Sequence, residues 1–251
     1  PTPWVALPIY TMRHFFHTGI MVRTDRGIDK PADLKGKKVG VPEYQQTAAL
    51  WIRGILEHDF GVSQYQIHWY MERSEEMSHG GATGFKPPPG ISFQRIAGNK
   101  SVASTILANE LDVAHGSSPW VLQANTLDRS SRIAGKGDWS QIKPLFPDRM
   151  AEGARFYRQH GFLPVNHAYI IRGDIHRKHP WLAGKLYDGF VRAKACAQEK
   201  LAAQIPTALI FGQEYLATTR ELIGDDPFPF GIKANRAMLD NFRRMGVRIA
   251  I

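Results

Sequence analysis

The sequence has little of several features that mark whole classes of protein. Cys196 is its one cysteine, which excludes an intrachain disulfide framework and a cysteine-based zinc site. No apolar run approaches the ~18 residues that a membrane-spanning helix needs, so we expect no membrane-embedded part. The 43% of hydrophobic and 22% of charged residues exclude a disordered or coiled-coil chain, and the length suits one or two globular domains.

Short motifs for common chemistry are also missing. The sequence has no Gly-x-Gly-x-x-Gly, no phosphate-binding loop and no Gly-x-Ser-x-Gly turn, so nucleotide binding and serine hydrolysis have no support. No His-Glu-x-x-His occurs either, and a metal site made of His14, His17 and His167 would lack an obvious carboxylate ligand. We therefore expect no metal.

The positive charge is spread along the chain rather than clustered. Lysine and arginine exceed aspartate and glutamate by 9, but the densest groups, at residues 35–38 and 243–244, have no interleaved aromatic residues. We therefore do not expect nucleic-acid binding, and a small anionic ligand held by a few arginines fits the spread better. The sequence begins at Pro1 without a signal-peptide pattern, and this, together with the single thiol, favours the cytoplasm.

Strand and helix patterns alternate along the first half of the chain. Residues 37–41 form a short buried-type strand, residues 47–58 carry apolar side chains at helical spacing, and residues 66–70 form the next strand. A helical crossover between strands predicts a parallel sheet and an α/β fold. The same patterns predict further strands at 17–23, 91–96, 111–114 and 168–172, and further helices at 101–108, 151–160, 180–201, 214–223 and 235–245. Residues 74–90 are expected to form a loop.

A polar turn joins the strand at 37–41 to the following helix. In an open α/β sheet, ligands bind beyond the carboxyl ends of strands, and the free N–H groups of a helix start attract anions. Tyr44, Gln46 and Thr47 would add side-chain donors, and Arg53 would add a positive charge. The alternative is a capped helix whose Tyr44 and Arg53 face solvent.

Two further segments place polar groups next to predicted strands. If residues 13–17 are extended, Arg13 and His17 share one face and can line one pocket; the alternative is a surface loop. Asn166 and His167 stand at the start of an apolar strand, which suits a positioned acid or base as well as a structural histidine.

Together these phrases resemble the 4,5-dihydroxyphthalate decarboxylase family. The resemblance rests on residues 39–54, 161–167, 179–181 and 226–236, and it extends from about residue 13 to residue 245. The family is similar in fold to type II periplasmic binding proteins, which implies two α/β lobes with the ligand cleft between them. On this basis we expect residues 1–34 to form part of lobe one and a crossover, 35–165 to form lobe two, and 166–251 to return to lobe one. The N-terminal part of lobe one would be absent from this sequence.

The resemblance implies a carboxy-lyase that acts on a hydroxylated aromatic acid, most directly 4,5-dihydroxyphthalate, which would yield protocatechuate. A hydroxyl para to the carboxylate pushes electrons to the reacting carbon, so no cofactor is expected. His167 or His17 would protonate the ring carbon, and the other histidine would face the phenol. Substrate-binding roles then fall to Arg13, Tyr44, Gln46, Thr47, Arg53, Asn166 and Arg236.

Two other functions stay open at this point. A non-catalytic solute-binding protein of an ABC transporter for a small aromatic anion would have the same cleft and would be periplasmic. A pyrimidine-precursor synthase of the same superfamily would consume a histidine, but no cysteine-rich iron motif supports it. The expected partner is the small aromatic acid, without nucleic acid or membrane, and the number of copies of the chain in an assembly is left open.

Overall fold

The computed structural model describes residues 3–78, 86–115 and 131–249. The chain divides into two compact units, each built from two stretches of sequence. Unit 1 contains Pro1–His14 and Ala154–Asp240, and unit 2 contains Phe15–Gly153 and Asn241–Ile251. Two of the passages from one unit to the other fall within helices, in α3 (Arg149–His160) and in α7 (Arg236–Ile249).

This division differs from the expected boundaries at residues 34 and 165. The strand at Ile20–Arg23 pairs with two strands of the unit 2 sheet, so residues 15–34 belong to that unit and only residues 1–14 belong to unit 1. The last residues also return to unit 2, because the ring of Phe242 packs against Trp51 with a centroid distance of 5.3 Å. Backbone pairing and ring packing of this kind join residues that are distant in sequence.

Unit 2 is built on one mixed sheet that confirms the predicted α/β class. Within the described residues the sheet has six strands, in the spatial order β5 (Ser92–Arg95), β4 (His68–Met71), β3 (Lys38–Val41), β6 (Val113–His115), β2 (Ile20–Arg23) and β7 (Ile142–Pro144). The pairs β4–β5, β3–β4 and β3–β6 are parallel, as the helical crossover predicts. The strand β2 is antiparallel to both of its neighbours.

Two helices of unit 2 follow strands of this sheet in the chain. The helix α1 (Thr47–Phe60) follows β3 and ends at Gly61, whose left-handed backbone (φ 64°) suits a glycine after a helix. The short helix α2 (Val102–Leu107) packs on the face to which Gly40 belongs. A Cβ at Gly40 would lie 2.6 Å from Cδ1 of Leu111 and 2.9 Å from Cγ1 of Val102, so this close approach requires glycine.

The strand expected at residues 17–23 is shorter in the structure. Residues Phe16–Gly19 form a 3₁₀ helix, η1, and β2 begins only at Ile20. The hydroxyl of Thr18 donates a hydrogen bond to the carbonyl of Phe15 at 2.8 Å, which stabilises this turn instead of an extended chain. Unit 2 also contains the 3₁₀ helices η2 (Thr24–Arg26), η3 (Pro31–Leu34), η4 (Gln64–Gln66) and η7 (Trp139–Gln141). The loop expected at 74–90 lies partly outside the described residues.

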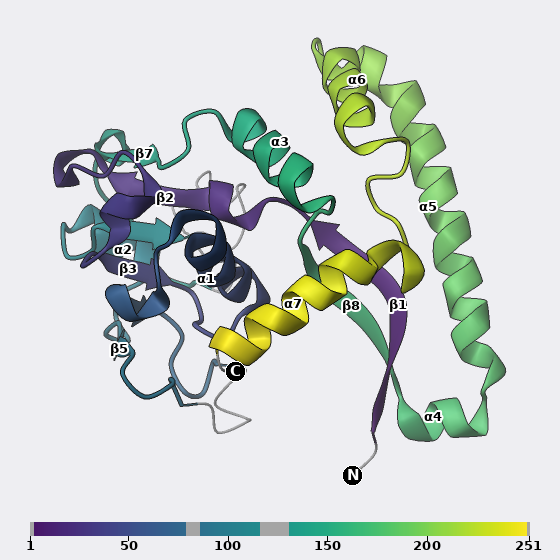
Figure 1. Cartoon of the computed structure of the whole chain (residues 1–251), viewed down its shortest axis with the longest axis horizontal. Helices are drawn as coiled ribbons and strands as arrows, with labels where there is room; N and C mark the ends of the chain where they lie inside the picture. The colour runs from purple at the N-terminus through teal and green to yellow at the C-terminus, as the bar shows by residue number, and fades with distance from the viewer. Residues whose placement is uncertain (1–2, 79–85, 116–130, 250–251) are drawn as a thin grey trace. The chain divides into compact units, whose positions relative to one another are not determined.

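Unit 1 contains a long two-stranded antiparallel ribbon, formed by β1 (Trp4–Arg13) and β8 (Val165–Arg172). The long helix α5 (Trp181–Ala208) runs beside this ribbon (Figure 1). Its Leu186 and Phe190 pack against the buried cluster that Leu7, Ile9 and Ile171 of the ribbon form. The remaining helices of this unit are α4 (Gly173–Lys178), α6 (Gly212–Ile223) and η8 (Lys233–Asn235). No helix in the described part of the chain has the length and apolar character that crossing a bilayer requires.

Candidate functional site

The carboxyl edge of the unit 2 sheet has the topology of a ligand site. The chain runs from β3 outward to β4 and β5 and then returns to β6 on the other side of β3. Ligands of open α/β sheets bind beyond the strand ends at such a switch point. Residues 42–47 follow β3 at this edge, and His115 ends β6 there, buried. Because β2 starts with Ile20 paired to His115, the preceding η1 lies at the same edge.

His17 of η1 is fully buried and is hydrogen-bonded to a carboxylate from another element. Its Nε2 lies 2.7 Å from Oε1 of Glu152, which belongs to the first half of α3. The ring of Phe146 packs edge-on against the imidazole at a centroid distance of 5.5 Å. A carboxylate–imidazole pair shielded from water in this way is a typical unit for holding or moving a proton.

A second α3 side chain reaches η1 from the same helix. Arg149 is half-buried, and its Nε donates a hydrogen bond to the carbonyl oxygen of Thr18 at 2.9 Å. Burial lowers the pKa of the Arg149 guanidinium. Sequence reasoning missed Arg149 and Glu152, although residues three apart on a helix share one face and this spacing could have drawn attention to them.

The turn after β3 is held by a buried carboxylate that the sequence analysis did not single out. Glu43 is fully buried, and its Oε2 accepts a hydrogen bond from Nη1 of Arg73 at 2.7 Å. Its Oε1 accepts from Ser78 Oγ and from Gln45 Nε2, both at 2.7 Å. Gln46 precedes α1 and provides no side-chain cap, so the first-turn N–H groups can bind an anion. A substrate-binding role for Gln46 and Thr47 stays a prediction.

Tyr44 and Arg53 face the core of unit 2, which differs from the expectation that they contact a ligand or solvent. The Tyr44 hydroxyl donates to Gln64 Oε1, and the Arg53 guanidinium lies 3.8 Å from the centroid of the Tyr44 ring. Arg53 also donates to the carbonyl oxygen of Tyr44. Burial raises the pKa of Tyr44 to about 12 and lowers the pKa of Arg53 to about 10, so both groups keep their ordinary charge at neutral pH.

In unit 1, Arg13 is buried and holds the loop that precedes α7. Its Nη2 donates to the Pro229 carbonyl oxygen at 2.7 Å and to Asn235 Oδ1 at 2.6 Å. Burial lowers the pKa of Arg13 to about 10, and the negative charge of Asp226 opposes this shift. Arg13 lines a cavity of about 100 Å³ together with Tyr157 and Asn235.

The other predicted residues of unit 1 lie apart from this cavity lining. Asn166 and His167 are neighbours on β8, and Nδ2 of Asn166 lies 3.3 Å from Nε2 of His167, whose side chain is exposed. Arg236 is exposed at the start of α7. The structure therefore groups His17 with the segment 42–47 along one edge of the unit 2 sheet. A substrate-binding or catalytic role for the unit 1 residues stays a prediction; these residues are Arg13, Asn166, His167 and Arg236.

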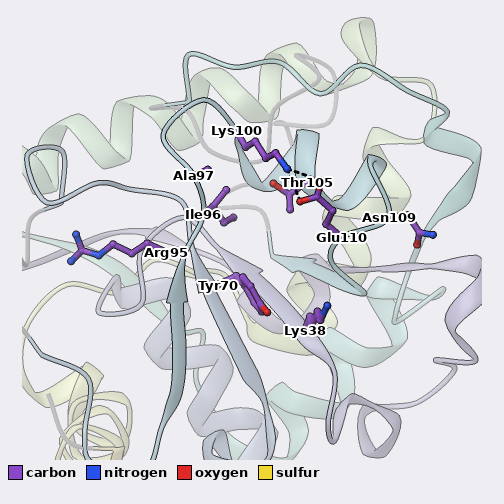
Figure 2. Close-up of a pocket in the computed structure, with 9 residues that line it drawn as sticks. All are labelled: Lys38, Tyr70, Arg95, Ile96, Ala97, Lys100, Thr105, Asn109 and Glu110. Carbon is purple, nitrogen blue, oxygen red and sulfur yellow. Dashed lines mark hydrogen bonds and ion pairs between the residues drawn. The ribbon is translucent and has the colours of Figure 1, made fainter.

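A hollow of about 440 Å³ beside α2 contains none of the predicted site residues. Figure 2 shows Tyr70 in this hollow and Lys100 facing Glu110, whose two oxygens lie 2.6 and 2.7 Å from the Lys100 ammonium. Arg95 points away from the other labelled residues and pairs with the exposed Glu75 at 3.3 Å. The charges of this hollow therefore do not converge on one point. The described residues also contain no group of three potential ligands suited to a metal ion.

The fold and the polar sheet edge define an α/β protein of the two-lobed binding-protein class. The family described as NMT1/THI5 like matches residues 7–80. The crystal structure of the desulfurization enzyme DszB matches 98% of this chain and 72% of that chain, with a TM-score of 0.50 and 14% identity. At this identity the likeness shows the fold alone.

Two curated relatives identify the family within this class. The 4,5-dihydroxyphthalate decarboxylase of Comamonas testosteroni is 32% identical over 243 residues, which cover 96% of this chain and 70% of that protein. The enzyme of the same name from Pseudomonas putida is 36% identical over 115 residues, covering 46% of this chain and 45% of that protein. The chain belongs to the 4,5-dihydroxyphthalate decarboxylase family, and the resemblance found in the sequence is confirmed.

Proposed function

We propose that the chain catalyses the cofactor-independent decarboxylation of a hydroxylated aromatic acid, most directly of 4,5-dihydroxyphthalate to protocatechuate. Its family membership supports the reaction class and the substrate. The structural observation that carries the proposal is the buried pair of His17 and Glu152 at the carboxyl edge of the unit 2 sheet. This edge is where an open α/β sheet binds its ligand.

In the proposed reaction, protonated His17 is the acid that protonates the substrate ring. The ring carbon that bears the carboxylate takes the proton as the imidazole N–H bond breaks, and the para hydroxyl supplies electron density as it takes on carbonyl character. The bond from this carbon to the carboxylate then breaks, its electron pair restores the aromatic ring, and CO2 leaves. A proton from solvent returns His17 to its charged state, so atoms and electrons balance without an external electron acceptor.

The structure favours His17 over His167 as this acid. His17 has no exposed surface, and its Nε2 lies 2.7 Å from a carboxylate oxygen of Glu152. His167 is exposed, and its neighbour Asn166 carries no charge. A general acid in a site shielded from water gives its proton to the substrate without competition from solvent.

Two groups at the same sheet edge can bind the carboxylates of the substrate. Arg149 uses only Nε in the hydrogen bond to Thr18, and its terminal nitrogens make no hydrogen bond within the described residues. The uncapped start of α1 at Gln46 and Thr47 offers backbone N–H groups. We propose that Arg149 takes the charge-pairing role that the sequence suggested for Arg53, because Arg53 is directed into the core.

The decisive experiment measures CO2 release and ring deuteration in D2O from a panel of hydroxylated benzoates and phthalates. We expect His17→Ala to lower the rate by ~100- to 10,000-fold, the usual effect of losing a general acid, while substrate binding persists. His68→Ala, which alters an exposed histidine of the same unit, is the matched control and should keep its rate. If the unmodified protein binds these acids tightly but releases no CO2 from any of them, the protein is a solute binder and the proposal is wrong.

A further inference from the structure

We propose that Glu152 is a positioning residue for His17, a role that rests on the proposed function above. The two side chains come from elements 135 residues apart in sequence, and they meet at 2.7 Å. The side chain of His17 is 0% exposed and that of Glu152 is 10% exposed. The sequence alone gave no reason to pair them.

The hydrogen bond determines which ring nitrogen of His17 reacts. An ionised carboxylate can only accept hydrogen bonds, so Nε2 of His17 must carry a proton when it contacts Glu152. The proton that comes and goes during the reaction is therefore the one on Nδ1. When Nδ1–H gives its proton to the ring carbon, His17 becomes the neutral Nε2–H tautomer and keeps its bond to Glu152.

The first turn of α3 is anchored so that Glu152 keeps this position. The backbone N–H of Ala151 donates to Asp148 Oδ1 at 2.8 Å, which caps the start of the helix. Nε of Arg149 donates a hydrogen bond to the carbonyl oxygen of Thr18, the residue after His17. Gly153 allows the close approach, because a Cβ there would lie 2.5 Å from Cδ2 of Phe15. These contacts on both sides of Glu152 fix the distance between α3 and η1.

A merely structural ion pair and a positioning residue give different kinetics. For Glu152→Gln we expect kcat to fall by at least ~10-fold with KM little changed, since carboxylate–histidine pairs in hydrolases lose up to ~10⁴-fold on a similar change. In a His17→Ala background the same substitution should cause no further loss, because Glu152 acts through His17. Glu110→Gln, which breaks the exposed pair with Lys100, is the control and should leave kcat unchanged in both backgrounds.

Nitrogen and carbon NMR of labelled histidine tests the pair without relying on turnover. In the unmodified protein, neutral His17 should be the Nε2–H tautomer, and Glu152→Gln should alter the population of that tautomer or the shifts of Nε2. A neutral ring protonated on Nδ1, or equal losses of kcat from Glu152→Gln with and without His17, would overturn the proposal. If the unmodified protein shows the Nε2–H tautomer but releases no CO2, the decarboxylase function fails while the pairing of His17 by Glu152 stands.

Discussion

Replacing Arg53 distinguishes a core residue from a ligand-binding one. The structure places its guanidinium 3.8 Å from the centroid of the Tyr44 ring, with 1% of the residue exposed. It lies 5.9 Å from the centroid of the Trp69 ring and donates to the carbonyl of Tyr44. Since these contacts are internal to unit 2, we expect Arg53→Ala to lower the free energy of unfolding rather than to act on ligand affinity first.

The magnitude follows from the contacts that are lost. A desolvated cation–π contact contributes ~2 kcal/mol, and a hydrogen bond to a charged donor contributes ~1.5–3 kcal/mol. Removing the burial cost of the charge offsets part of this sum, while the cavity left by alanine adds to it. We therefore expect Arg53→Ala to cost about 3–5 kcal/mol. Arg53→Met fills most of the volume and should cost about 1–3 kcal/mol, chiefly through the unpaired carbonyl of Tyr44.

Urea unfolding followed by tryptophan fluorescence measures these costs, because Trp51 and Trp69 are buried in the same unit. Arg220→Ala is the matched control, since this arginine is exposed and lies 3.9 Å from Asp225. Calorimetry with phthalate on the same variants measures binding. A normal unfolding midpoint in Arg53→Ala together with a loss of phthalate affinity would refute the core placement and return Arg53 to the ligand site.

Three further substitutions and one control test the packing and charges of unit 2 by the same unfolding assay. Glu43→Gln should cost ~3–5 kcal/mol, because it removes the carboxylate charge that lies 2.7 Å from the buried guanidinium of Arg73. The control Glu110→Gln breaks an exposed pair and should cost less than ~1 kcal/mol, and similar costs for the two variants would contradict this expectation. Gly40→Ala should cost ~1–3 kcal/mol through overpacking against α2, and a neutral effect would show that the contact relaxes freely. Burial raises the pKa of Tyr44 from 10 to about 12, so its contribution to stability is present below pH 10 and is lost as the pH rises towards 12. Tyr44→Phe should therefore reduce the loss of stability between pH 9 and ~11.5, and an unchanged slope would disprove the shift.

Local patterns predict the elements of unit 2 well because they depend on neighbours in sequence. The helical spacing at 47–58 and the stop at Gly61 correspond to α1, and the crossover correctly indicates the parallel pairing of β3 and β4. The orientation of Arg53 was not predictable in this way. Ala48 to Leu56 are all buried, so this stretch of α1 has no solvent face for a charged side chain to occupy.

The chemistry of the candidate site is predictable only in part. Sequence spacing points to His17 and to the start of α1, because both adjoin a strand. It could not supply Glu152, since a hydrogen bond between residues 135 positions apart depends on how α3 docks on η1. The boundaries of the two units are also not predictable from local sequence. Composition shifts mark loops, but the packing of Phe242 on Trp51 depends on contacts between segments that are distant in sequence.

The placement of residues beyond 240 in unit 2 has a consequence for the order of folding during synthesis. The strands of that unit are complete once the ribosome has made residue 144, and the rest of unit 1 is made before Phe242 and Met245 emerge. Met245 packs against Gly54, and Phe242 covers Trp51, so α1 keeps an uncovered apolar surface until then. A nascent chain therefore has a long interval, until residues 242–245 are made, in which this surface is open to chaperones.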